Sequence, residues 1–267
     1  MIERMIATRD GTRIFARAEG VPAGPSLVLS NSLGTTLHLW DSILPLLPEG
    51  LHIVRYDMRG HGRSDVPEGP YAMGQLISDA EAVCNAFEVK DAMFCGLSVG
   101  GMIAQGLAVK RPDLIRALVL ACTAAKIGNP ALWESRINVV SNKGMAPMTD
   151  TVMQRWFGRD FYNSAAMAPW AQMFADTPPV GYCGVCAAIS GTDFYTPTSG
   201  LRIPTLGIAG TEDGSTPPDL VRETTDLIPG SQFALIRRAG HLPCVERPDD
   251  FARHLVDFIA ATGHLSP

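Results

Sequence analysis

Four short apolar runs that lack strict alternation of apolar and polar residues constrain this fold more than any other feature. They are Ser26–Asn31, Leu51–Tyr56, Asp91–Gly96 and Ile115–Cys122. Such runs are typical of strands buried on both faces, which occur in parallel sheets covered by helices. Helical patterns separate them at His38–Leu46, Gly74–Phe87 and Val99–Lys110. The first half of the chain therefore predicts a parallel sheet built from strand–helix units.

The same alternation continues at both ends of the chain. Two strands at Ile2–Ala7 and Thr12–Ala18 are joined by Asp10-Gly11, a turn pair typical of a β-hairpin. After residue 190 the pattern resumes with Ile203–Ala209, Pro218–Leu227, Gln232–Arg237 and Asp249–Ala261. We therefore expect an α/β fold with a mostly parallel sheet and helices on both of its faces.

The segment 125–190, called the cap below, interrupts this alternation. It contains no β-rich run, yet it holds three of the four tryptophans and five of the eleven methionines, which are Trp133, Trp156, Trp170, Met145, Met148, Met153, Met167 and Met173. Methionine and tryptophan adapt to the shapes of apolar ligands. We expect an inserted helical lid at 125–190, with residues 1–124 and 191–267 forming the core.

Composition excludes several classes of protein. The 267 residues are 46% hydrophobic and 18% charged, which excludes a disordered chain. The net charge of −5 offers no positive field for phosphate backbones, so we expect no nucleic-acid partner. No apolar run approaches the length of a membrane span, and the first residues lack a signal peptide. Six scattered cysteines predict a reduced, cytoplasmic protein. Cys183 and Cys186 have metal-ligand spacing but no second ligand pair, so we expect no metal or other cofactor.

A nucleophile is predicted at Ser98. Gly96-Leu97-Ser98-Val99-Gly100 has the G-x-S-x-G pattern, and it lies between a buried strand and a helix. A serine on such a turn adopts a strained conformation that exposes its hydroxyl above the sheet edge, and glycines are needed where side chains would collide. The alternative is a plain tight turn with a solvated serine.

The partners of a serine on this turn follow it in the order acid, then histidine. Of the three histidines after Ser98, His241 alone lies in a loop between a predicted strand and the last helix, so we expect it to be the base. The acid is expected in the loop after Ile203–Ala209, where Glu212 and Asp213 are neighbours. We favour Asp213, whose short side chain precedes a glycine. Its carboxylate would hold the imidazole and stabilise the imidazolium.

An oxyanion hole is expected from two backbone N–H groups. Leu33 lies in the loop Ser30–Thr36 after a predicted strand, and Val99 directly follows the nucleophile. The segment Asp57–Asp65, with two glycines, is interpreted as a structural turn packed beside the oxyanion loop. Its His61 precedes Ser98, which is the wrong chain order for the base.

With these motifs in place, the chain resembles the α/β-hydrolase superfamily along essentially its whole length. Within that superfamily it resembles the 3-oxoadipate enol-lactonases. The likeness lies in Ser30–Thr36 with Leu39-Trp40-Asp41, in Tyr56–Ser64, in Phe94–Gly101, and in the cap stretch from Ala124–Gly128 to Leu132–Ile137. The elbow has Val99 where methionine is commoner in the family.

The resemblance implies hydrolysis of 3-oxoadipate enol-lactone, a small anionic lactone, to 3-oxoadipate in aromatic catabolism, without metal or organic cofactor. A substrate carboxylate needs a donor in a dry pocket. Our candidate for this donor, the carboxylate clamp, is Arg136, with Trp133 one helical turn before it. Arg155 or Lys126 could take its place. Arg136 would then be an ordinary surface arginine. The oligomeric state is not predicted.

Three other functions are compatible with the same motifs. A carboxylesterase or a carbon–carbon bond hydrolase would use the same three side chains, because the pocket decides between them. A ligand-binding receptor that retains the triad would turn over its ligand far more slowly than an enzyme does.

Overall fold

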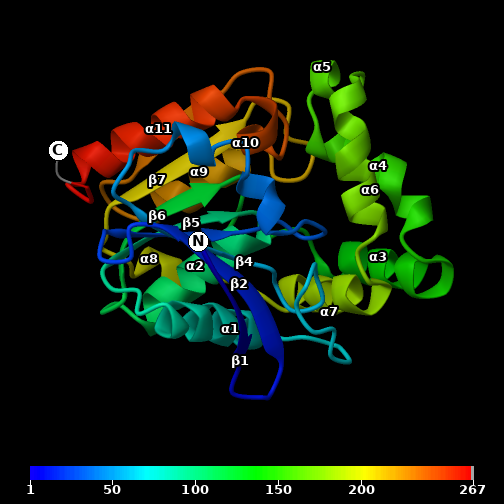
Figure 1. Ribbon diagram of the computed structural model, residues 1–267. Coiled ribbons are helices and arrows are strands. Elements are labelled where there is room, and N and C mark those ends of the chain that lie inside the picture. The colour runs from blue at the N-terminus through cyan, green and yellow to red at the C-terminus, as the bar shows by residue number, and fades with distance from the viewer. Residues whose placement is uncertain (266–267) are drawn as a thin grey trace.

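The computed structural model describes residues 1–265, in which eight strands form one sheet (Figure 1). Their order across the sheet is β1-β2-β4-β3-β5-β6-β7-β8. The strands are β1 (Ile2–Ala7), β2 (Arg13–Gly20), β3 (Ser26–Ser30), β4 (His52–Tyr56), β5 (Ala92–Leu97), β6 (Ile115–Ala121), β7 (Thr205–Gly210) and β8 (Gln232–Ile236). Only β1–β2 and β2–β4 are antiparallel pairs. This confirms the predicted mostly parallel sheet.

Burial explains why the central strands lack an alternating pattern. Every residue of β3, β4, β5 and β7 is buried, because helices cover both faces of the sheet. The edge strands differ: β1 is exposed at five of its six positions, and β8 is buried only at Ile236. Apolar side chains on both faces of a central strand are therefore what the layered structure requires.

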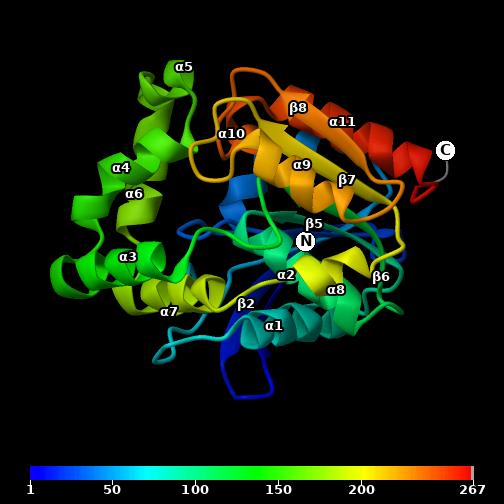
Figure 2. The ribbon, with the colours of Figure 1, turned by 180° about the vertical axis from the view of Figure 1, so that it is seen from behind.

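Helices lie on both sides of the sheet (Figures 1 and 2). On one side α1 (Met73–Ala86) and α2 (Val99–Lys110) pack together, with α8 (Tyr195–Ser199) against α2. On the other side α11 (Pro248–Ala261) packs on the 3-10 helix η1 (Leu37–Trp40) through Phe251 and Trp40, whose ring centroids are 6.1 Å apart. Helix α9 (Pro218–Asp226) packs against β7 and β8, and α10 (Pro243–Glu246) precedes α11. Within residues 1–265, no helix combines the length and apolar character needed to cross a membrane.

The predicted helix at His38–Leu46 is wrong. The structure instead has two short 3-10 helices, η1 and η2 (Leu44–Leu46), separated by a turn. Pro45 lies inside the predicted helix, where it has no N–H to donate to the preceding turn. The other predicted helices and strands are present with small changes at their ends, and α8 and α10 are additional short helices.

The cap segment consists of helices in the structure. They are α3 (Pro130–Lys143), α4 (Ala146–Trp156), α5 (Arg159–Tyr162), η3 (Ala165–Met167), α6 (Ala168–Ala175) and α7 (Pro179–Ser190). They stand beside the sheet in both views, with α3 and α7 at one end and α5 at the other (Figures 1 and 2). One close contact joins α7 to the core: a side chain on Gly60 would come within 2.4 Å of the Gly181 Cα.

The parallel strands end at a common edge of the sheet. Ser30 of β3 pairs with Gly96 of β5, Leu97 with Ala121 of β6, and Gly210 of β7 with Ile236 of β8. The loops that follow these strands carry the predicted oxyanion donor, nucleophile, acid and base. Ligands of open α/β sheets bind at this edge.

Replacing Gly60 by alanine tests the contact between α7 and the core. Gly60 has a φ of +78°, and its new methyl group would meet the Gly181 backbone, so we expect Gly60→Ala to lower the free energy of unfolding by about 1–3 kcal/mol. Gly74→Ala is the matched control. Gly74 lies in α1 with nothing within 4 Å of the added methyl, so this variant should be as stable as the parent or slightly more stable. Equal urea midpoints for the two variants would contradict the expectation.

Candidate active site

Ser98 lies on a strained turn between β5 and α2. Its φ of +59° and ψ of −119° are rare for a residue with a side chain. The turn closes because its glycines leave no space for side chains: a Cβ on Gly96 would lie 2.1 Å from the Gly100 oxygen, and one on Gly100 would lie 2.3 Å from the Ser30 oxygen. The Ser98 N–H donates to the Ala121 carbonyl at 2.9 Å. The G-x-S-x-G pattern therefore has the backbone geometry of a nucleophile elbow.

The structure brings His241 and Asp213 together. The distance from His241 Nδ1 to Asp213 Oδ2 is 2.9 Å. Both residues are buried, with His241 2% exposed and Asp213 5% exposed. Asp213 also accepts hydrogen bonds from the Ser215 and Thr216 N–H groups at 2.7 and 2.9 Å. The Thr216 hydroxyl lies 2.9 Å from Asp213 Oδ2 and 3.2 Å from His241 Nδ1. These donors hold the carboxylate of Asp213 against the imidazole.

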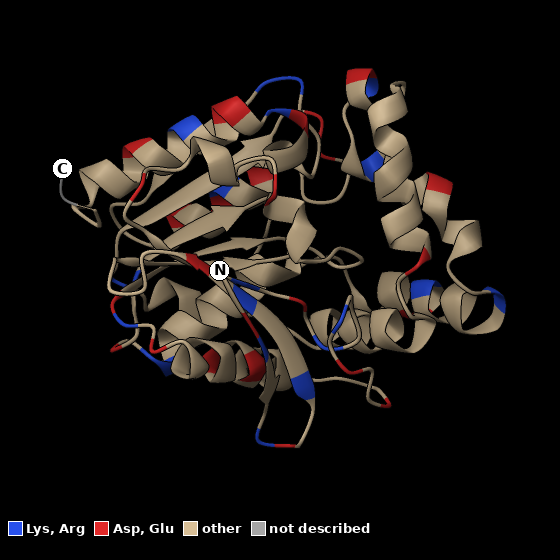
Figure 3. Cartoon of the chain, viewed as in Figure 1, with Lys and Arg blue, Asp and Glu red and all other residues tan. Residues whose placement is uncertain are grey.

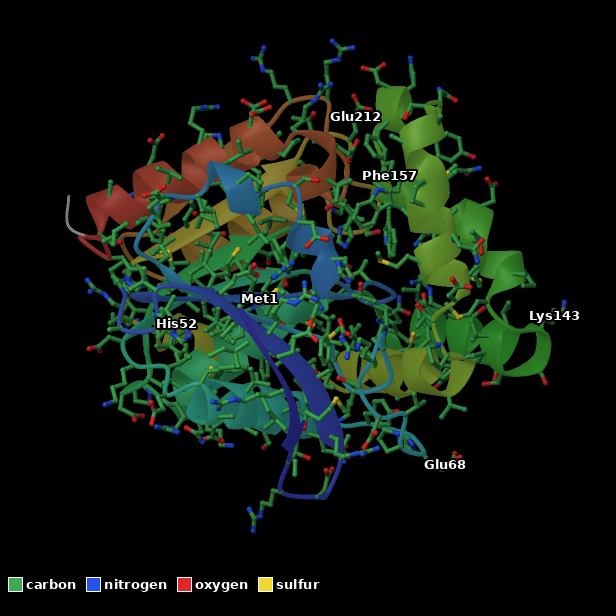
Figure 4. The ribbon with its side chains drawn as sticks, viewed as in Figure 1. Met1, His52, Glu68, Lys143, Phe157 and Glu212 are labelled. Atoms are coloured by element: carbon green, nitrogen blue, oxygen red, sulfur yellow. The ribbon has the colours of Figure 1, made fainter. Side chains whose placement is uncertain are left out.

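Glu212, the alternative acid, lies elsewhere. Its side chain is exposed and its Oε2 accepts a hydrogen bond from the Arg159 N–H at 2.8 Å. Figure 4 shows Glu212 and Phe157 near the place where the cap meets the core. The geometry thus favours Asp213 over Glu212 as the partner of His241.

Ser98 and His241 line one cavity of about 190 Å³, together with Ser32, Leu33 and side chains of the cap. Within residues 1–265, His241 Nε2 has Ser32 Oγ as a hydrogen-bond partner at 3.5 Å, and it is not bonded to Ser98 Oγ. Hydrogen bonds between a nucleophile and its base often tighten only when substrate binds. Nothing in the sequence pattern pointed to Ser32 as a neighbour of the imidazole.

The expected oxyanion donors lie beside the nucleophile. Leu33 forms part of the cavity wall, and Val99 is buried as the first residue of α2. Among the described residues, neither backbone N–H donates to a protein acceptor. Two unoccupied backbone donors near a nucleophile suit a developing alkoxide, for which such donors supply several kcal/mol.

The segment 57–65 holds the oxyanion loop in place, as the sequence predicts. The Gly34 N–H donates to His61 Nε2 at 3.0 Å, and the Leu37 N–H donates to Asp57 Oδ1 at 2.7 Å. Since Nε2 accepts, the imidazole proton is on Nδ1, which faces the Arg59 carbonyl at 3.3 Å. Burial lowers the pKa of His61 to about 4. His61 is therefore neutral at physiological pH and supports the loop that carries Leu33.

The C-terminus of α4 is hydrogen-bonded to the loops that carry Asp213 and His241, and we call this set of contacts the joint. The His241 N–H donates to the Trp156 carbonyl at 2.7 Å, and the Gly214 N–H donates to the Arg155 carbonyl at 3.1 Å. Glu246 spans the same joint, because its two oxygens accept the N–H groups of Gly240 at 2.6 Å and Gly158 at 2.9 Å. Burial raises the pKa of Glu246 to about 7. No motif in the sequence marks Glu246 for this role.

The three residues predicted as candidates for binding a substrate carboxylate do not all lie at the cavity. Arg136 lines the cavity, its guanidinium lies 5.2 Å from the centre of the Trp133 ring, and it donates to the Tyr182 hydroxyl at 3.2 Å. Arg155 lines the same cavity. Lys126 does not: it pairs with Asp193 at 3.1 Å, and both side chains are about half exposed.

One group of donors near the triad has the chemistry of a metal site. Atoms of Cys122, Asp213 and His241 lie within 4.8 Å of one another. Zinc binds the thiolate form of cysteine, whereas burial raises the pKa of the Cys122 thiol far above its usual range. Asp213 and His241 are also already bonded to each other. These residues fit a catalytic pair beside a buried thiol better than a metal site.

Comparison with known proteins agrees with the fold. Residues 25–248 match the family model described as the alpha/beta hydrolase fold. The protein belongs to the α/β-hydrolase family, and it is a hydrolase of the class that acts on carboxylic esters.

Several proteins that are similar to this chain are named enol-lactonases. The 3-oxoadipate enol-lactonase 1 of Acinetobacter baylyi is 32% identical over 257 residues, which is 96% of each chain. The 3-oxoadipate enol-lactonase 2 of that organism is 32% identical over 237 residues, or 88% of each chain. The crystal structure of the enol-lactonase from Burkholderia xenovorans LB400 superposes with a TM-score of 0.92 at 35% identity, covering 96% of this chain and 100% of that one. The resemblance to enol-lactonases is thus confirmed.

Acid should destabilise the protein through His61. Its folded pKa of about 4 is below the ordinary 6.5, so the unfolded chain binds the proton first as pH falls. Stability should then decrease between pH 6.5 and pH 4 by up to about 3 kcal/mol from this residue. We expect His61→Gln, which keeps an acceptor for Gly34, to lack this part of the loss when urea unfolding is compared at pH 7.5 and pH 4.5.

His38→Gln is the control for this measurement, because His38 is an exposed histidine bonded to Asp41. It should show the acid sensitivity of the parent. If the parent and His61→Gln lost equal stability between the two pH values, His61 would not be the buried neutral support described above.

Proposed function

We propose that this protein hydrolyses 3-oxoadipate enol-lactone to 3-oxoadipate through a serine acyl-enzyme, as a cytoplasmic step of aromatic-compound catabolism. The observation that carries the proposal is Arg136 in the wall of the cavity that Ser98 and His241 share. A fixed guanidinium there suits a substrate that bears a carboxylate in addition to its ester bond. The names of the relatives at 32% identity point to the same substrate.

The first half of the reaction opens the ring. Ser98 Oγ attacks the lactone carbonyl while His241 Nε2 takes the hydroxyl proton, and Asp213 stabilises the imidazolium. The N–H groups of Leu33 and Val99 hold the oxyanion. Collapse of the tetrahedral intermediate breaks the ring C–O bond, and His241 returns the proton to the leaving enol oxygen. The enol remains tethered to the acyl group, and its conversion to the ketone removes the nucleophile that would close the ring again.

The second half releases the product. His241 removes a proton from a water molecule, which attacks the acyl carbon, and the same two N–H groups hold the second oxyanion. The imidazolium then returns its proton to Ser98 Oγ, which leaves. Binding of the distant carboxylate by Arg136 would keep the chain in place through both steps.

The cysteines are consistent with a reducing compartment. All six are free thiols, and burial raises the pKa of Cys84, Cys95, Cys122, Cys186 and Cys244. Disulfides are rare in the cytoplasm, and thiols of high pKa are inert there. The two cysteines of α7 that have metal-ligand spacing, Cys183 and Cys186, are among these free thiols.

Substrate and mechanism are tested together by kcat/KM on 3-oxoadipate enol-lactone and on phenyl acetate, a neutral aryl ester. We expect a clear preference for the lactone. Ser98→Ala should lower kcat by about 10⁴-fold or more for both substrates, because it removes the nucleophile. Faster turnover of the ester would contradict the proposed substrate, and a fully active Ser98→Ala variant would contradict the mechanism.

The carboxylate clamp is tested by Arg136→Ala. Loss of a charge-assisted hydrogen bond should raise KM for the anionic lactone by about 10- to 100-fold while leaving KM for phenyl acetate nearly unchanged. Lys126→Ala is the matched control, since Lys126 pairs with Asp193 outside the cavity. Small and equal effects of Arg136→Ala on both substrates would show that this arginine does not bind the carboxylate.

A further inference from the structure

In the described part of the chain, the cavity beside Ser98 and His241 has positively charged residues in its lining and no negatively charged ones. Its lining includes the side chains of Arg136 and Arg155, but among the described residues it includes no aspartate or glutamate. Neither guanidinium has a carboxylate partner within 4.0 Å in residues 1–265. The chain as a whole differs from this lining, because Figure 3 shows basic and acidic residues interspersed along it and its net charge is −5. Two half-buried cations without counter-charges favour anionic ligands.

Arg155 is not required to complete the helix on which it lies. It is in the last turn of α4, where a basic side chain can bind the terminal carbonyls. Here the carbonyls of Arg155 and Trp156 already accept the N–H groups of Gly214 and His241. A side chain on Gly214 would lie 3.4 Å from Arg155 Cγ, so the arginine stem lies along the loop of Asp213. Arg155, which lines the cavity, therefore lies on the side of the cavity next to the loop of Asp213.

Arg136 enters the same cavity from another helix. It belongs to α3, where Trp133 stacks against it and Tyr182 of α7 accepts its hydrogen bond. The Trp133 indole is itself fixed by a 2.7 Å hydrogen bond to the Ile127 carbonyl. In Figure 1, α3 and α7 lie at one end of the cap, while the C-terminus of α4 meets the core toward the other. The two arginines thus reach the same cavity from different helices.

We propose that this cavity is a dicarboxylate site in which Arg136 and Arg155 each bind one carboxylate of a short aliphatic diacid. The part that these two arginines play in turnover rests on the proposed function. Hydrolysis adds water across the ring C–O bond, so that a ligand with one carboxylate becomes a product with two, and one proton is released to solvent. Arg136 binds the carboxylate present from the start. Arg155, beside the triad loops, binds the carboxylate that hydrolysis creates.

Titration calorimetry with two probes of equal chain length tests this site. Adipate has a carboxylate at each end of six carbons, and hexanoate has one. We expect the parent protein to bind adipate at least tenfold more tightly than hexanoate. Arg155→Gln and Arg136→Gln should each lose most of this preference, whereas Arg155→Lys, which keeps the cation, should retain part of it.

Lys143→Gln is the matched control. It removes one positive charge from the end of α3, where Figure 4 shows Lys143 far from the core, and it should keep the preference for adipate. Equal affinity of the parent for the two probes, or an unchanged preference in Arg155→Gln, would overturn the proposed site.

Binding of the probes does not depend on turnover, so the two proposals fail separately. A protein that prefers adipate but does not hydrolyse the enol-lactone would have the dicarboxylate site without the proposed activity. A protein that hydrolyses the lactone without any preference for adipate would have the activity and lack the site.

Discussion

The strained backbone of Ser98 is the constraint on which the rest of the site depends. A residue with a φ of +59° stays in place only because the strand before it and the helix after it hold it there. That support requires α2 to approach β3 so closely that Gly100 contacts the Ser30 carbonyl. The same contact brings the loop after β3 beside the nucleophile. One backbone arrangement therefore places both the hydroxyl and the N–H groups that we propose as oxyanion donors.

Support for the other two members of the triad comes from far along the chain. The loops of Asp213 and His241 end neighbouring strands, yet they are fastened by the carbonyls of Arg155 and Trp156 in the cap. Glu246 adds a second fastening between Gly240 and Gly158. The helical segment therefore does more than line a pocket, because it also contributes to the positions of His241 and Asp213. Helix α4 carries both Arg155, which lines the cavity, and the carbonyls that fasten these two loops.

Much of this arrangement could be predicted because it is encoded locally. Buried strands show themselves as unbroken apolar runs, and Ser98 is identified by glycines within two residues of it. Chain order left three histidines after Ser98, and the position of His241 in a loop selected it. The glycine after Asp213 favoured this residue over Glu212, and the structure agrees because Asp213 lies 2.9 Å from His241 Nδ1 while Glu212 contacts Arg159. The helix expected at His38–Leu46 is absent, because Pro45 has no N–H to donate to the preceding turn. Other contacts join residues that are distant in the sequence, such as those of Ser32, Thr216 and Glu246. Lys126 is likewise held outside the cavity by Asp193, which is far along the chain. No spacing in the sequence predicts these contacts.

The joint at the end of α4 has a consequence for how the domain can be altered. A cap that swung outward as a rigid body would pull its terminal carbonyls away from the backbone of Gly214 and His241. Ligand entry that keeps the loops of Asp213 and His241 in place must therefore leave this joint closed. By the same reasoning, a chimaera that receives a foreign cap inherits new anchoring for its catalytic loops along with a new pocket. Peptide 155–158 would have to be kept if only the selectivity is to change.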